Sequence, residues 1–262
     1  MKTNHKLLLL LFFLAVLLPA AGLPARGQAV LPRWEKEPSA EQIIRHEGFT
    51  VSYNNKDACP NWVAWELTPE EASANVTGRT DFFTEDPLAE GKQASYKDFK
   101  RTPEGYERGH MAPSADFKWS KTANEQTFYF TNICAQNHVL NEGMWLELEQ
   151  RCRTYAKMYR NPVQIVCGPV FKENEHTYFS QKNIRIPHSF FKAILVKAKG
   201  RTYGIAFIMH NQPISAMDDI FRYEVSFDYL REITGLDPFP GMEYTEPGKK
   251  FPFNISWKKP QK

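Results

Sequence analysis

Several chemical signatures are missing from this chain of 262 residues. It has no HExxH segment, which would indicate a zinc protease, and no GxSxG segment, which would indicate a serine esterase. Its four cysteines form no CxxC pair, so the usual spacing of structural zinc ligands is absent. No internal repeat and no Gly/Ser-rich or charge-block linker divides the sequence. These absences exclude two hydrolase classes and a repeat architecture, and they favour a single domain.

Long hydrophobic runs are absent apart from the twelve apolar residues between Leu7 and Leu18. That run is too short to cross a bilayer, since a spanning helix needs about 20 apolar residues. Basic residues precede it and small residues follow it, a pattern that predicts a secretory signal over residues 1–29. Cleavage after Gly22 and cleavage after Ala29 fit equally well. We therefore expect an exported protein, periplasmic or secreted, with one domain over residues 30–262 and no membrane association.

The chain outside the predicted leader also lacks a net charge. Three of the 33 basic residues, Lys2, Lys6 and Arg26, lie in the predicted leader, so 30 basic residues face 30 acidic ones in the remainder. A near-neutral chain has no global positive field to attract a polyanion. Binding of nucleic acid would therefore need a local basic patch and a metal ion.

The four cysteines, Cys59, Cys134, Cys152 and Cys167, belong to a chain that is expected to be exported. In an oxidising compartment we expect two disulfides, although three pairings exist and the spacing selects none of them. Four buried free thiols are the alternative.

The apolar pattern predicts an α+β fold with a mainly antiparallel central β-sheet flanked by helices. Alternating apolar residues and turn signals predict strands over several segments, with a tight turn at Lys199 and Gly200 between the last two. A short helix is expected between Ser226 and Gly235, another short helical stretch within residues 30–50, and a long surface loop over residues 78–106. The predicted strands cover residues 48–55, 61–68, 163–171, 184–198 and 201–210.

The central part of the sequence predicts a strand, a loop, a second strand and a helix in that order. The strands lie near residues 106–110 and 127–133, and the helix lies near 139–158. Within the helix, apolar residues recur at intervals of three and four, as one buried face requires. These residues are Trp145, Leu148, Cys152 and Tyr155.

The motif Glu107-Arg108-Gly109-His110 is followed by HMAPSADFKWS and by TFYFTNICAQNHVLNEGMWLELE. Together these segments resemble the DNA/RNA non-specific endonuclease family of the ββα-metal (His-Me finger) superfamily, whose motif is Asp-Arg-Gly-His. Looser similarity in GPVF, IPHSFFKAIL, AFIMHNQ and TGLDPFP extends over most of the chain. The resemblance implies a ββα-metal finger and Mg²⁺-dependent hydrolysis of DNA and RNA to 5′-phosphate products, with Mn²⁺ as a substitute metal. It leaves the choice between monomer and homodimer open.

His110 and Asn141 are the two residues on which this chemistry depends. The resemblance makes His110 the general base, and an imidazole with a pKa near about 6.5 is largely neutral at pH 7. Asn141 matches the family's protein ligand to Mg²⁺, a cation that keeps several waters and accepts a neutral amide oxygen. Helix capping is the alternative role for Asn141.

Glu149 matches the family's helix glutamate, eight residues after Asn141. In an ideal helix the two Cα atoms would lie roughly 12 Å apart along the axis and about 80° apart around it, so joint coordination is difficult. We therefore expect Glu149 to hold a metal-bound water, with an exposed helix charge as the alternative.

The remaining site predictions concern one asparagine and two arginines. Asn132 matches a family asparagine that would orient substrate or base, with a strand-end turn residue as the alternative. Arg108 would contact phosphate or tie down the loop. Arg79 resembles the family's upstream arginine, which offsets charge on the scissile phosphate. Glu107 stands where the family has Asp, which changes the reach of the carboxylate.

The rival function is a catalytically inactive, exported nucleic-acid-binding protein with the same fold. The presence of His110, Asn132 and Asn141 argues against it. The other histidines, including His46 and His138, are expected to be ordinary packed or surface residues.

Overall fold

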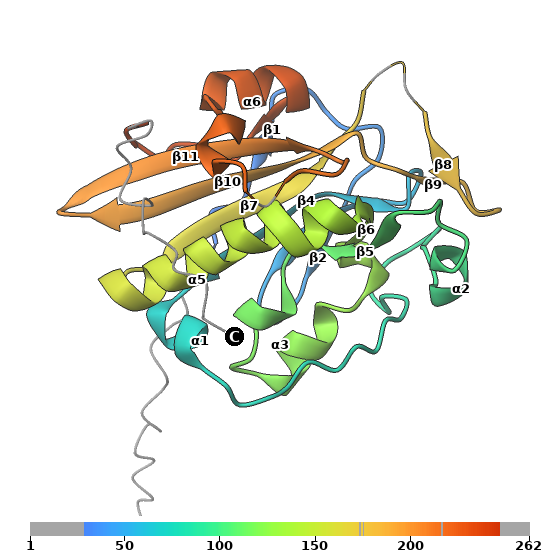
Figure 1. Cartoon of the computed structure of the whole chain (residues 1–262), viewed down its shortest axis with the longest axis horizontal. Coiled ribbons are helices and arrows are strands. Elements are labelled where there is room, and N and C mark those ends of the chain that lie inside the picture. Colours follow the sequence, from blue (N-terminus) through green and yellow to red (C-terminus); the bar gives the residue numbers. More distant parts are fainter. Residues whose placement is uncertain (1–28, 173, 175, 216, 247–262) are drawn as a thin grey trace, which may run out of the picture.

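A computed structural model describes residues 29–246 except 173, 175 and 216, so the predicted leader over residues 1–29 lies outside the described part except for its last residue. The centre is a seven-stranded sheet in the order β12-β11-β10-β7-β4-β3-β2, and every neighbouring pair in it is antiparallel. The α+β fold with a mainly antiparallel sheet is thus confirmed (Figure 1). The strands are β2 (Gln42–Arg45), β3 (Thr50–Asn54), β4 (Cys59–Leu67), β7 (Val163–Val170), β10 (Ser189–Ala198), β11 (Arg201–His210) and β12 (Glu224–Val225).

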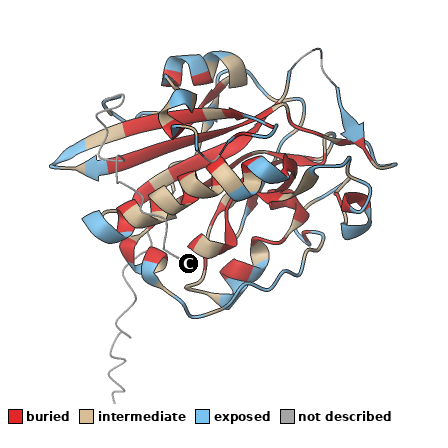
Figure 2. Ribbon diagram, in the orientation of Figure 1, coloured by how far each residue is buried: buried red, intermediate tan, exposed pale blue. Residues whose placement is uncertain are grey.

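Both faces of the sheet are covered, which is why its central strands are apolar along most of their length. Side chains of a strand point alternately to opposite faces. In β4, Val63 and Trp65 join the larger apolar core, whereas Trp62 and Ala64 join the smaller one. The larger core lies under helix α5 (Leu146–Tyr159), and burial is concentrated along the central strands and the inner face of this helix (Figure 2).

The second face of the sheet is covered by α6 (Phe227–Thr234) together with a small pair of strands, β1 (Arg33–Trp34) and β13 (Leu236–Asp237) (Figure 1). The α6 helix begins after Ser226, whose side chain accepts a hydrogen bond from the Tyr229 main chain, and it ends at Gly235, as predicted. No helix in the described residues has the length and hydrophobicity to cross a bilayer.

The hairpin between β10 and β11 closes through Lys199 and Gly200, with Ala198 paired to Arg201. Both turn residues have positive φ, 49° and 74°, as a two-residue type I′ turn requires. The predicted tight turn is therefore confirmed.

The predicted helical stretch within residues 30–50 is wrong. Residues 42–45 form β2 at the edge of the sheet, where Ile44 is buried and pairs with Val51 of β3. The open edge of β3 offers main-chain hydrogen bonds and a core contact, and these outweigh a weak local helical preference.

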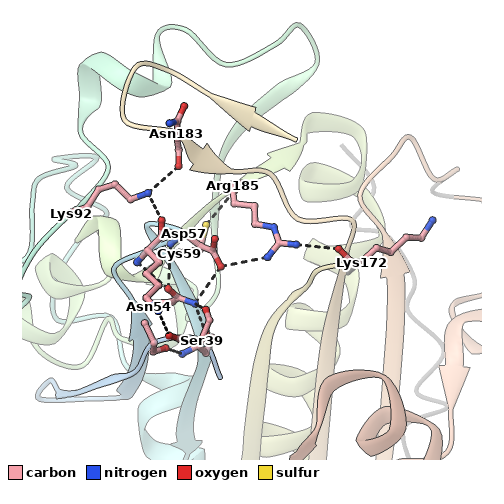
Figure 3. Close-up of polar contacts among 11 residues, drawn as sticks. Ser39, Asn54, Asp57, Cys59, Lys92, Lys172, Asn183 and Arg185 are labelled. Carbon is pink, nitrogen blue, oxygen red and sulfur yellow. Dashed lines mark hydrogen bonds and ion pairs between the residues drawn. The ribbon is translucent and has the colours of Figure 1, made fainter. Parts of the chain in front are cut away.

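The remaining elements are short and surround the sheet. The hairpin of β8 (Tyr178–Phe179) and β9 (Ile184–Arg185) is fastened to the β3–β4 turn by Arg185. Its main-chain nitrogen donates to the Asp57 carbonyl at 3.0 Å, and its guanidinium donates to the Lys172 carbonyl at 3.0 Å (Figure 3). The other short helices are α1 (Pro69–Ser73), α2 (Tyr96–Phe99) and α3 (Lys121–Gln126).

All four cysteines are buried free thiols, so the expectation of two disulfides is wrong and the alternative holds. They lie on different elements and pack within the core. Two of them are satisfied by weak hydrogen bonds, because Cys59 Sγ donates to the Arg185 carbonyl and Cys167 Sγ to the Met111 carbonyl, both at 3.3 Å.

Candidate active site

A two-stranded finger leads into the long helix and carries the motif. Strands β5 (Tyr106–His110) and β6 (Ile133–Asn137) are antiparallel, with His110 opposite Ile133. The predicted order of strand, loop, strand and helix is confirmed, but α3 and a 3₁₀ turn at Ser114–Asp116 lie within the predicted loop.

The second finger strand was predicted too early in the chain. Residues 127–129 follow the end of α3, and Phe130–Asn132 form a 3₁₀ turn, so the strand begins only at Ile133. Phe128 and Phe130 lie in these turns, and both side chains are buried. Their alternation with polar residues therefore resembles a strand without forming one.

The helix after the finger is not regular. It starts as α4 (His138–Leu140), passes through a π-helical turn at Asn141–Trp145, and continues as α5. Such turns insert an extra residue into a helix and often occur at functional sites. The ideal-helix geometry between Asn141 and Glu149 therefore does not apply, and both side chains line the same pocket. Trp145, on the predicted buried face, is buried.

Only a glycine fits between Arg108 and His110, because Gln136 of β6 lies too close to β5 here for a side chain at position 109. A Cβ at this position would overlap Oε1 and Cβ of Gln136, a fully buried residue of β6. The glycine thus allows Gln136 to lie across β5.

The finger, the π turn, α5 and the loop before β5 enclose a pocket of about 350 Å³. Asn132 does not line it. The predicted site residues that do are Arg79, Arg108, His110, Asn141 and Glu149.

His110 is buried at the pocket, and its Nε2 has no hydrogen-bond partner among the described residues. The ring packs edge-to-face against Phe128 at 5.0 Å and lies 5.4 Å from Phe83. Burial, together with the charges of Arg79 and Arg108, lowers the pKa of His110 to about 3. The imidazole is therefore neutral at pH 7, but not because its pKa is ordinary, as the sequence had suggested.

Arg79 reaches the pocket from the surface loop. Its Nε donates to Asp81 Oδ1 at 2.5 Å, and its guanidinium lies 5.2 Å from the ring centre of Phe128. A weaker contact joins Nη1 to Ser114 Oγ at 3.4 Å. Asp81 and Phe128 together hold a half-exposed cation beside His110.

Arg108 lies between two aromatic rings, 4.6 Å from the centre of Phe83 and 5.0 Å from that of Tyr96. Its buried Nε has no hydrogen-bond partner, and the described residues place no carboxylate in an ion pair with it. Of its two predicted roles, phosphate contact agrees with this environment, whereas a loop tie would need hydrogen bonds that the described structure lacks.

Glu107 joins Asn141 to His138. Its Oε1 accepts from Asn141 Nδ2 at 2.7 Å, and its Oε2 lies 2.9 Å from His138 Nδ1. This hydrogen bond to Glu107 raises the pKa of His138. Because the Asn141 nitrogen is engaged, its Oδ1 remains for a cation. The sequence had assigned His138 to an ordinary surface role.

Glu149 is buried, so its alternative role as an exposed helix charge is wrong. Burial raises its pKa to about 7, although Lys192 and Arg153 oppose the shift. Arg153 Nη1 lies 3.9 Å from Glu149 and 2.7 Å from Asp116 Oδ1. Asp116 also accepts from Trp65 Nε1 at 3.0 Å, which anchors the pair to β4.

Asn132 is fully buried beneath the loop that follows His110. Its Oδ1 accepts from Ala112 N, and its Nδ2 donates to the carbonyls of Ala112 and Thr127, all at 2.9 Å. Both amide hydrogens are therefore used. Asn132 positions the chain beside the base and has no donor left for a substrate.

The profile of the DNA/RNA non-specific endonuclease family matches residues 33–245. The chain belongs to this family. It is 34% identical over 215 residues to the mitochondrial nuclease of Saccharomyces cerevisiae, a match that covers 74% of this chain and 64% of the yeast protein. It is 30% identical over 217 residues to the mitochondrial nuclease EXOG of Xenopus laevis, over 78% of this chain and 59% of the frog protein. The chain thus spans less than two thirds of these two relatives.

The fold is also similar to a solved structure of the EndoG/EndoGI complex, with a TM-score of 0.72 and 25% identity. This similarity covers 80% of the present chain and 90% of the other. It agrees with the ββα-metal finger expected for the DNA/RNA non-specific endonuclease family.

Two residues that position the side chains of this endonuclease-family site were not predicted from the sequence. Arg153 follows Glu149 by four residues. This helical spacing was the only feature of the sequence that indicated their contact. Asp81 fixes Arg79 from a loop with no periodic pattern. Two carboxylates and an imidazole, from Glu107, His138 and Glu142, also lie within 4.8 Å of one another at the rim and offer further ligand atoms for a metal.

Proposed function

We propose that this member of the DNA/RNA non-specific endonuclease family is a Mg²⁺-dependent endonuclease that hydrolyses phosphodiester bonds in DNA and RNA. The observation that carries the proposal is the convergence, in one pocket, of a neutral imidazole, two guanidinium groups, an amide oxygen and a buried carboxylate. A protein that only binds nucleic acid has no need to bury an unpartnered imidazole. This favours catalysis over the inactive alternative.

His110 accepts the proton of the attacking water on its imidazole, which lines the pocket. A pKa of about 3 makes the free imidazole a weak base, and the adjacent arginine charges contribute to that value. A phosphodiester anion bound at Arg79 and Arg108 offsets those charges. The pKa of His110 then rises toward the range in which a general base is efficient.

The donor atoms of the pocket fit Mg²⁺, which prefers oxygen ligands and keeps several waters. Asn141 would hold the ion through Oδ1, and Glu149 would hold one of its waters. When bound, Mg²⁺ supplies charge stabilisation at the phosphate and at the leaving oxygen, and Mn²⁺ substitutes for it. Arg79 and Arg108 stabilise the charge on the other phosphate oxygens.

Breaking the bond between phosphorus and the 3′-oxygen leaves 5′-phosphate ends. The pocket offers charged groups rather than a surface shaped for one base, and contacts to phosphate carry no sequence information. Little discrimination among sequences, or between DNA and RNA, follows from this.

The leader supports a second part of the proposal, export to the periplasm or the medium. Both yeast and frog relatives are named as mitochondrial, so location has to be measured for this chain itself. Mass spectrometry of the protein recovered from each cell fraction should show a mature chain that begins at Leu23 or Val30. Recovery from the interior of the cell of an uncleaved chain that still begins at residue 1 would contradict export.

Plasmid DNA and RNA are incubated with the purified protein in Mg²⁺, Mn²⁺, Ca²⁺ or excess EDTA. We expect cleavage with Mg²⁺ and none with EDTA. His110→Ala should lower kcat about a thousandfold, the typical contribution of a general base. His176→Ala, at an exposed histidine outside the pocket, is the matched control and should behave as wild type. Inactivity of the wild type with every metal contradicts the nuclease, and full activity of His110→Ala contradicts the base.

A further inference from the structure

A series of alternating rings and cations leads out of the pocket toward solvent. Arg108 lies over Phe83 and over Tyr96, and Lys100 Nζ lies 5.1 Å from the centre of the Tyr96 ring. We call Phe83, Arg108, Tyr96 and Lys100 the cation–ring strip. Its inner end touches the His110 imidazole through Phe83, at 5.4 Å. Its outer end is exposed, since 47% of Tyr96 is accessible to solvent.

The outer end of the strip lies within the local basic patch that a near-neutral chain needs in order to bind a polyanion. Lys97, Lys100 and Arg101 belong to α2 or follow it directly, and all three are exposed. The described residues place none of these cations in an ion pair. The one acidic residue of α2, Asp98, is already engaged, because it accepts from Ser95 at 2.6 Å and lies 3.4 Å from Lys182.

We propose that the cation–ring strip binds the phosphate next to the scissile one on the same nucleic-acid strand, so that the protein has a second nucleotide subsite along α2. The inference rests on the proposed nuclease function. Arg108 belongs both to the pocket and to the strip, so a strand with one phosphate in the pocket continues over Tyr96. Lys100 is the next cation along this path.

Each member of the strip has a separate task. Phe83 and Tyr96 hold the planar guanidinium of Arg108 between two ring faces, an arrangement that keeps its donors free for phosphate oxygens. Lys100 contributes a compact charge to the neighbouring phosphate, and the exposed ring of Tyr96 offers an apolar surface to the sugar or base between them. None of these contacts selects a sequence.

The test compares two substrates that share the scissile group but differ in the neighbouring phosphate. One is bis(p-nitrophenyl) phosphate, a diester with a single phosphate, and the other is a fluorescent single-stranded oligodeoxynucleotide of twelve nucleotides. Lys100→Gln should lower the ratio of kcat/KM for the oligonucleotide to that for the diester about fivefold, as loss of one phosphate contact predicts. Lys100→Arg should retain the ratio.

The matched control is Lys157→Gln, at an exposed lysine near the far end of α5, on the opposite side of the molecule from α2 (Figure 1). Its ratio should equal that of the wild type. Tyr96→Phe should also keep the ratio, whereas Tyr96→Leu should lower it. These paired replacements separate the ring from the hydroxyl, and circular dichroism confirms that each variant is folded.

Binding supplies a readout that is independent of turnover. In a His110→Ala background with EDTA, anisotropy of the oligonucleotide gives Kd across a series of KCl concentrations. Adding Lys100→Gln should make the slope of log Kd against log salt shallower by about 0.7, the value for one phosphate of a single strand.

Two outcomes overturn the subsite while leaving the nuclease in place. In one, Lys100→Gln leaves the kinetic ratio at the wild-type value and the salt slope at the value of the His110→Ala background. In the other, it lowers kcat/KM for both substrates equally. If the wild type cleaves neither substrate with any metal, the proposed function itself has failed.

Discussion

Burial shifts the two titratable groups of the pocket in opposite directions. The pKa of His110 falls to about 3, because burial disfavours the imidazolium, and that of Glu149 rises to about 7, because burial disfavours the carboxylate. Burial therefore shifts each group toward its neutral form in the free protein. A bound cation and a bound phosphate supply the opposite charges, so we expect the ionisation of the pocket to depend on its ligands.

Replacing Glu149 with Gln should stabilise the metal-free protein at alkaline pH. The folded-state pKa of about 7 lies above the ordinary value of 4.5, so this group's contribution to stability is complete below pH 4.5 and is lost as pH rises through 7. In EDTA, the free energy of unfolding of Glu149→Gln relative to wild type should therefore increase between pH 5 and pH 8 by on the order of 2 kcal/mol. Urea denaturation at both pH values measures it.

The control for this experiment is Glu104→Gln, at an exposed carboxylate. Its difference from wild type should be the same at both pH values. A difference for Glu149→Gln that does not change with pH would contradict the raised pKa of the buried carboxylate.

At the scale of elements, the finger and the π turn set the positions of the catalytic groups. The five-residue pairing of β5 with β6 places His110 opposite Ile133, and the hydrogen bonds of Asn132 hold the loop that follows. The π turn then directs Asn141 and Glu149 into one pocket. The close approach of Gln136 to Gly109 makes the spacing of the two strands critical.

Gly109→Ala should separate the finger strands and destabilise the protein by about 2 kcal/mol, the usual cost of overpacking. Activity should fall more than stability, because the His110 backbone moves with the strand. Adding Gln136→Gly should restore part of both, whereas Gln136→Ala should not, because its Cβ stays within overlap distance of the new Cβ. Urea denaturation and plasmid cleavage measure the two effects. Wild-type values for Gly109→Ala would contradict the close contact.

At the scale of the whole molecule, the finger is attached to a sheet that is buried on both faces. The larger core continues from the sheet into α5 and the finger, and it contains Cys134 of β6 as well as Cys167 of β7. The pocket therefore lies at the margin of the main core rather than on a separate module. Thiols from four different elements report on the integrity of that core.

The native protein should resist a polar thiol reagent such as 5,5′-dithiobis(2-nitrobenzoate). All four cysteines are at most 1% exposed, so we expect no reaction in native buffer and four thiols in guanidinium chloride without reductant. The serine replacement Cys152→Ser should lower the count to three and thereby calibrate the assay. Only two or no thiols in denatured wild type would restore the disulfide expectation.

Local patterns in the sequence determined the features that depend on neighbouring residues. They predicted the α+β class, the β10–β11 turn, the limits of α6 and the buried face of α5. The family resemblance of the ERGH segment, now supported by the profile match, pointed to His110 and Asn141. Turn conformation and helix caps involve only a few consecutive residues, so both can be predicted from the local sequence.

Only the tertiary structure decided what depends on contacts between distant segments. The start of β6, the π turn, the burial of Glu149 and the free thiols all follow from packing against the sheet. The pKa of His110 depends on its burial and on the charge of Arg79, and Arg108 packs against Tyr96 of α2. Burial and charge act through space, so sequence spacing alone does not specify them.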